Sequence, residues 1–140
     1  MKAKLLIGLC LVSSATFASD DSIVSTDTRA VINLSVQQKD FVLERMRRML
    51  ETLTAIQQSL VQESPEKVDD LVSLLFEYTR ENHPDGLHDS MPAGFQQMSK
   101  QMNVHWKKLA KENKDTSFIQ KEVVTIMSTC NACHRSYKIQ

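Results

Sequence analysis

Five consecutive residues near the C-terminus have types and spacing that could do chemistry: Cys130-Asn131-Ala132-Cys133-His134. Two thiols three positions apart can add to the two vinyl groups of a haem, and the adjoining imidazole can ligate its iron. Cys130 and Cys133 are therefore the predicted thioether anchors, and His134 is the predicted proximal iron ligand. The motif predicts one covalently attached haem c as the cofactor.

Two other uses of paired cysteines stay open as alternatives. A redox-active dithiol of the thioredoxin type lies where a helix begins, because the helix dipole then lowers the thiol pKa, whereas this motif lies toward a helix end. A zinc module needs further ligands, and His83, His88 and His105 show no paired spacing. A disulfide across so short a loop would add little stability. Haem attachment accounts best for the five residues together.

Apolar residues recur at alternating steps of three and four along several segments, which is the pattern of amphipathic helices packed in a bundle. We expect four helices, over about residues 36–62, 65–80, 92–113 and 117–137, the last three beginning at Ser64, Ser90 and Ser117. No segment shows the alternation of a strand. The sequence predicts an all-α fold, an antiparallel four-helix bundle with its haem near the C-terminal end of the fourth helix.

The place of the motif limits where a second iron ligand can lie. Only six residues follow His134, so a second ligand must come from upstream. In an antiparallel bundle the end of the fourth helix lies beside the early part of the first, where Met46 and Met49 fall on the apolar stripe. Either methionine can ligate iron through its sulfur, or simply fill space in the core.

The N-terminal residues differ in character from the rest. Two lysines precede an apolar run that ends at Val12, and small residues lead up to Ala18. This composition is typical of a cleaved secretory signal peptide, and the run is too short to span a bilayer. We expect a signal peptide over 1–18, a polar lead-in over 19–33 and the cytochrome domain over 34–140. Export predicts a periplasmic protein with no membrane span after signal removal.

Composition and charge argue against several function classes. Seventeen Lys and Arg balance 17 Asp and Glu, so the formal net charge is zero and the excess of positive charge that nucleic-acid binding needs is absent. Hydrophobic residues make up 41% of the chain, which is ordinary for a globular domain. Ser, Asp and Glu are scattered without a nucleophile–base pattern. We therefore expect a binding or electron-transfer protein and not an enzyme.

The C-terminal motif and its continuation over 135–137, together with Arg45 and Met49 in the first helix, resemble the class II cytochromes c, the family that includes cytochrome c′ and its low-spin relatives. The resemblance implies that Arg45 lies close to a haem propionate and that Met49 faces the open side of the iron. The two middle helices match only in pattern. The chain departs from the family at two positions: Lys138 stands where arginine is frequent, and Phe95 stands where a tryptophan precedes the third helix.

The function expected from these observations is electron transfer between redox partner proteins, with the iron ligated by His134 and Met49. The first alternative is a cytochrome c′-like protein whose iron keeps an open position for nitric oxide or carbon monoxide. The second is the haem-free dithiol or zinc module. A homodimer stays open, because Leu74 and Phe76 lie off the main apolar stripe of the second helix.

Overall fold

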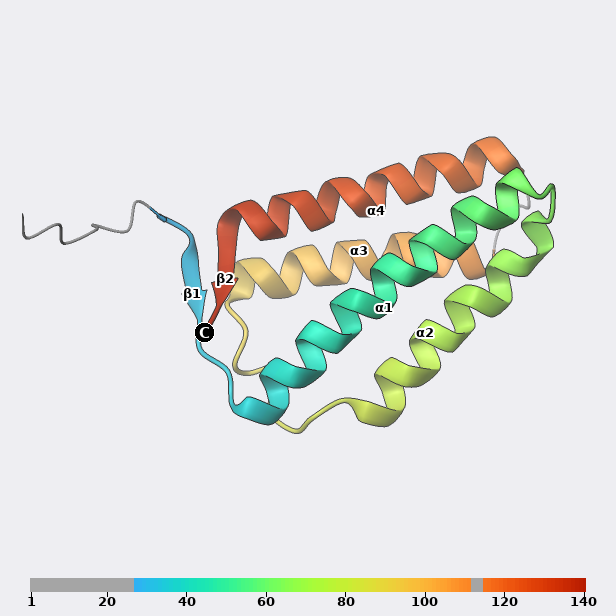
Figure 1. Cartoon of the computed structure of the whole chain (residues 1–140). Coiled ribbons are helices and arrows are strands. Elements are labelled where there is room, and N and C mark those ends of the chain that lie inside the picture. Colours follow the sequence, from blue (N-terminus) through green and yellow to red (C-terminus); the bar gives the residue numbers. More distant parts are fainter. Residues whose placement is uncertain (1–26, 112–114) are drawn as a thin grey trace, which may run out of the picture.

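The computed structural model describes residues 27–111 and 115–140, so the expected signal peptide over 1–18 lies outside the described residues. Four long helices dominate the described part (Figure 1): α1 (Val36–Val61), α2 (Val68–Asn82), α3 (Ala93–Lys111) and α4 (Thr116–Ser136). α3 packs against both α2 and α4, and α1 packs against α2. This mostly helical content confirms the predicted all-α fold class.

Side-chain caps set the beginnings of α1 and α4. The Ser35 hydroxyl accepts a hydrogen bond from the Gln38 backbone N–H (3.2 Å), and the Gln38 side chain accepts one from the Ser35 N–H (3.1 Å), which is a capping box. At α4 the Asp115 carboxylate accepts from the Phe118 N–H (3.1 Å). The predicted cap Ser117 is wrong, since its hydroxyl donates to Asp115. A carboxylate suits the positive end of the helix dipole better than a hydroxyl.

The predicted start of the second helix is also revised. Residues Pro65–Lys67 form a short 3-10 turn before α2 begins, and Ser64 makes no capping bond with its side chain. Its hydroxyl instead donates to the carbonyl of Gln62 at 3.3 Å. The link between α2 and α3 bends at Gly86, which takes a φ of 67°, a conformation that favours glycine. This bend returns the chain toward the start of α1.

The expectation of a chain without strands is wrong at one place. β1 (Ala30–Ile32), part of the expected lead-in, pairs in parallel with β2 (Tyr137–Ile139). Asp27 joins the two segments through ion pairs with Arg29 (2.8 Å) and Lys138 (3.4 Å), and the Arg29 guanidinium holds the pKa of Asp27 well below its usual range. Three residues are too few to show an alternating pattern, and the partner lies at the other end of the chain.

The apolar stripes of the helices meet in two hydrophobic clusters. The larger cluster surrounds Trp106, which is 1% exposed. Its other members include Leu53, Ile56, Val72, Leu75, Leu109, Ile119, Val123 and Ile126. The smaller cluster lies near the strand pair and consists of Ile32, Phe41, Val42, Leu87 and Met91. Residues of α1 belong to both clusters, so this helix connects the two halves of the core.

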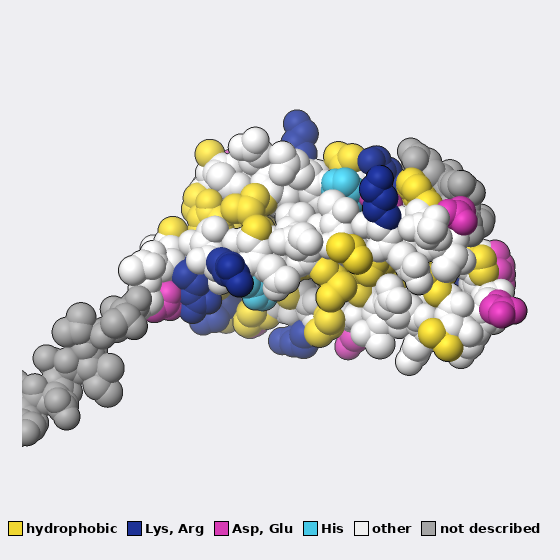
Figure 2. Space-filling view, turned by 90° about the horizontal axis from the view of Figure 1, so that it is seen from above, with side chains coloured by type: hydrophobic (Ala, Val, Ile, Leu, Met, Phe, Trp, Pro, Cys, Tyr) yellow, Lys and Arg dark blue, Asp and Glu magenta, His cyan; other side chains and the backbone are white. Residues whose placement is uncertain are grey.

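Several hydrophobic side chains stay outside both clusters. Figure 2 shows hydrophobic and charged side chains intermingled on the face seen from the side of α4. Val124 and Met127 of α4 are 62% and 49% exposed, and Leu74 of α2 is 63% exposed. Among the described residues, no helix combines the length and the apolar character needed to cross a membrane.

Candidate functional site

A cavity of about 830 Å³ lies among α1, the link after α2, α3 and the last turns of α4. Its volume falls in the range of cofactor pockets, roughly 300–1,000 Å³. Both hydrophobic clusters contribute to the wall, which makes the cavity mainly apolar. All five site residues expected from the sequence contribute to its lining: Arg45, Met49, Cys130, Cys133 and His134. The fold therefore brings Arg45 and Met49 of α1 and the C-terminal Cys-His motif of α4 to the same cavity.

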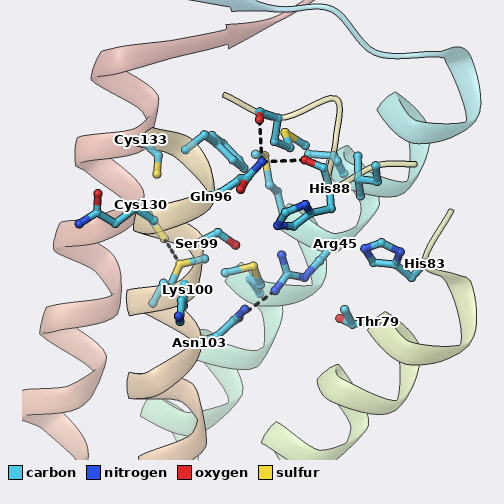
Figure 3. A pocket seen from close by; sticks show the side chains of 18 of the residues that line it. Arg45, Thr79, His83, His88, Gln96, Ser99, Lys100, Asn103, Cys130 and Cys133 are labelled. Carbon is cyan, nitrogen blue, oxygen red and sulfur yellow. Dashed lines mark hydrogen bonds between the residues drawn. The ribbon is translucent and has the colours of Figure 1, made fainter. Parts of the chain in front are cut away.

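The two thiols of the motif lie on α4 and face α3 (Figure 3). The Cys130 Sγ atom is 3.9 Å from the Met102 Sδ atom, and the Cys133 Sγ atom is 3.5 Å from the Met98 Sδ atom. Both cysteines are free and partly buried. Burial raises the pKa of each thiol, and the charge of Cys130 raises the pKa of Cys133 further. The thiols are thus held protonated beside thioethers.

These features bear on the two alternatives for the motif. A reactive dithiol needs a lowered thiol pKa, and here the pKa of both thiols is raised. The described residues contain no group of three or more His, Cys, Asp and Glu side chains that could hold a metal ion. His83 and His88 line the same cavity, whereas His105 pairs with the buried Glu122 at 2.5 Å. The described geometry does not favour either alternative.

His134 lines the cavity from the last turn of α4 and is exposed to solvent. The backbone around it is held from two sides. The Tyr137 N–H donates to the Cys133 carbonyl, and the Arg29 guanidinium donates to the carbonyl of His134 at 3.3 Å. The segment before α1 therefore fixes the helix end that carries the imidazole.

Both candidate methionines of α1 reach the cavity, but their environments differ. Met49 is 6% exposed and belongs to the larger hydrophobic cluster, beside Leu53. Met46 is partly buried and packs on the smaller cluster. Either sulfur is close enough to the cavity to meet a ligand there, and Met49 is the better shielded from water.

Arg45 is the most unusual side chain of the site. Its Nη2 atom donates to the Asn103 Oδ1 atom at 3.1 Å, while its Nε–H is buried without a hydrogen-bond partner. Burial lowers the pKa of this guanidinium. The neighbouring Arg47 and Arg48 are different, because both pair with Glu44. A desolvated guanidinium with an unused donor beside a cavity is suited to an anionic group.

The charges around the cavity share one sign. Lys100 and Lys107 are exposed residues of α3 that line the cavity, seven positions and so about two helical turns apart. No Asp or Glu is found among the described residues of the lining. The cavity thus combines apolar walls with basic groups, which fits an apolar molecule that carries negative charge at its edge.

Three contributors to the site are not singled out by the sequence. Asn103 holds Arg45, and Met98 and Met102 lie against the thiols. Both methionines fall on the expected apolar stripe, where they are indistinguishable from core residues. Asn103 lies next to Met102 on α3, and a polar residue bordering an apolar stripe is the signal that could have found it.

No family model, curated protein or solved structure matches this chain. The assignment of the site therefore depends on its own geometry and chemistry.

Proposed function

We propose that this chain is a periplasmic mono-haem c-type cytochrome that carries one electron between redox partner proteins. Cys130 and Cys133 hold the haem through thioethers, His134 is the proximal ligand of the iron and Met49 is the distal ligand. The fold that carries it is an antiparallel four-helix bundle of the class II cytochrome c kind. The hydrophobic cluster shared by α1 and α4 supports this arrangement.

The observation that carries the proposal is the convergence of all five expected residues on one cavity. Arg45 and Met49 are separated from the motif by most of the chain, so their meeting with it depends on the tertiary fold. The motif supplies two thiols and an imidazole from a single helix end, and α1 supplies a thioether sulfur and a guanidinium from another side. Those groups are the set that a covalent haem uses.

The residues present also fit the periphery of a haem. The buried Nε–H of Arg45 lacks a partner, and a propionate carboxylate would satisfy it while Asn103 orients the guanidinium. Lys100 and Lys107 add positive charge to the lining, which contains no acidic residue among those described. Apolar residues of both clusters would cover the faces of the macrocycle and exclude water.

When bound, the haem iron supplies the one-electron redox chemistry. The chain's own residues tune and protect that chemistry. Met49 and His134 would hold the iron as a ligand pair that raises its reduction potential, and the burial of Met49 excludes water from that part of the cavity. The exposed Lys100 and Lys107 give a partner with an acidic surface a complementary face near the site.

A second function is favoured by one observation. Met49 packs within the larger hydrophobic cluster, so its sulfur already has a place in the core that does not involve a ligand. If Met49 keeps that place, the distal position of the iron stays open, and the protein binds nitric oxide or carbon monoxide in the manner of a cytochrome c′. The two functions differ only in what Met49 does.

Optical spectra of the oxidised and reduced protein, before and after addition of carbon monoxide, test the proposal. We expect a low-spin spectrum that carbon monoxide changes little. Met49→Leu should convert the protein to high spin and admit carbon monoxide, whereas the matched control Met46→Leu should leave the spectrum unchanged. A wild-type protein that is high spin and binds carbon monoxide readily would replace electron transfer with gas binding. A colourless protein would refute both.

A further inference from the structure

Four sulfur atoms face one another across the contact between α3 and α4. Met98 and Met102 lie four positions apart on α3, and Cys130 and Cys133 lie three positions apart on α4, so each helix presents two sulfurs on one face. They pair one to one, with Sγ–Sδ distances of 3.9 Å for Cys130 with Met102 and 3.5 Å for Cys133 with Met98. Figure 3 shows both thiols on the side of α4 that faces α3.

The separation within each pair is compatible with two ligands on one metal ion. Two sulfurs bound at about 2.3 Å in a tetrahedral arrangement lie about 3.8 Å apart, and the Cys130–Met102 and Cys133–Met98 distances of 3.9 and 3.5 Å are close to that value. In the structure each thiol lies within hydrogen-bonding distance of a thioether sulfur. The same thioether sulfurs would bind a soft metal ion once the thiols lose their protons.

We infer that the haem-free chain binds one Cu(I) ion between α3 and α4, with Cys130, Cys133, Met98 and Met102 as its four sulfur ligands. Thiolate and thioether ligands together select Cu(I), whereas zinc prefers thiolate, imidazole and carboxylate. The inference is independent of the proposed function, because it concerns the two thiols before they react with haem.

The chemistry of binding is an exchange of protons for metal with no change of oxidation state. Two thiols release two protons, and Cu(I) takes their place, so the charge of the bound group is +1 − 2 = −1. The basic lining of the cavity, with Arg45, Lys100 and Lys107 and no acidic residue among those described, favours that negative charge. Thioether bonds to haem consume the same thiols, so copper and haem are mutually exclusive occupants.

The test is an anaerobic titration of the full-length, reduced, haem-free protein with Cu(I) held by a coloured bidentate chelator. We expect one Cu(I) per chain and, by X-ray absorption, four Cu–S bonds near 2.3 Å. The double variant Met98→Leu/Met102→Leu should weaken Cu(I) binding by roughly 100-fold or more, since even outer-shell partners of metal sites contribute about 10–100-fold. Leucine keeps the volume and apolar character of the two side chains.

The matched control is Met127→Leu, which removes an exposed methionine of α4 outside this contact and should leave Cu(I) affinity unchanged. Circular dichroism shows whether each variant is folded. Wild-type affinity in the folded Met98→Leu/Met102→Leu variant would overturn the inference, because the dithiol alone would then be the ligand. Two-coordinate copper, or no binding, would overturn it equally. A protein that binds Cu(I) as described yet never acquires haem would refute the proposed function and leave this site standing.

Discussion

Replacing Arg45 by methionine should have opposite effects on the haem-free and the haem-loaded protein. In the structure the Arg45 guanidinium is desolvated, its Nε–H is buried without a hydrogen-bond partner, and its Nη2 atom donates to the Asn103 Oδ1 atom at 3.1 Å. Removing a buried, unsatisfied donor recovers about 1–3 kcal/mol, against about 1 kcal/mol for the lost bond to a partly exposed amide. The methionine also adds apolar contacts in an apolar cavity. The free energy of unfolding should rise by about 1–2 kcal/mol.

In the haem-loaded protein the substitution should lower the free energy of unfolding, because Arg45 then has an anionic partner. Loss of a hydrogen bond between charged groups costs about 1.5–3 kcal/mol. Urea unfolding followed by circular dichroism measures both free energies, and in a thermal melt the haem-free variant should unfold about 3–10 °C higher. Arg47→Met is the control, since Arg47 is exposed and pairs with Glu44; its effect should stay within about 0.5 kcal/mol in both forms. An Arg45→Met variant that is destabilised in both forms would refute the assignment of Arg45 to an anionic ligand.

Three further predictions concern side-chain packing, a buried ion pair and helix capping. A Cβ atom on Gly94 would lie 2.6 Å from the Tyr137 hydroxyl, so Gly94→Ala should lower the free energy of unfolding in urea by about 1–3 kcal/mol. Adding Tyr137→Phe to that variant should restore most of the lost stability, and no recovery would contradict a clash with the hydroxyl. His105→Phe should cost about 3 kcal/mol because it removes the nearer partner of the buried Glu122 carboxylate and leaves Lys108 at 4.0 Å, whereas His105→Phe with Glu122→Leu should be near neutral. Additive losses in this double-mutant cycle would contradict the pairing. Ser35→Ala should cost about 1 kcal/mol and fray the start of α1 in hydrogen exchange, with unchanged protection there as the opposing result.

The helices could be predicted because their signals are local and repeated. The expected first helix over 36–62 corresponds to α1 at Val36–Val61, and its stripe supplies Met49 and Leu53 to the larger cluster. Periodicity at steps of three and four is enough to define such a face. Helix starts were less predictable, because Ser117 and Asp115 both have capping side chains and only their geometry shows which one accepts the backbone N–H.

The parts of the site that the sequence misses depend on contacts between distant segments. The strand pair β1–β2 joins residues near the two ends of the described chain, and no local pattern marks it. Asn103 gains its role from Arg45 on another helix, and Met98 and Met102 gain theirs from thiols on α4. The motif itself could be found because its three reactive residues are adjacent in sequence.

The measurement that tests the central claim most directly is the fate of the pigment in acid–acetone extraction of protein exported by a host that attaches haem to c-type cytochromes, followed by intact mass spectrometry. Thioethers at Cys130 and Cys133 predict that the colour stays with the polypeptide and that its mass exceeds that of the chain by one haem. The Cys130→Ser/Cys133→Ser variant should lose both the retained colour and the added mass. Colour that leaves with the solvent, or a wild-type chain at its bare mass with two titratable thiols, would contradict covalent haem and with it the proposed function.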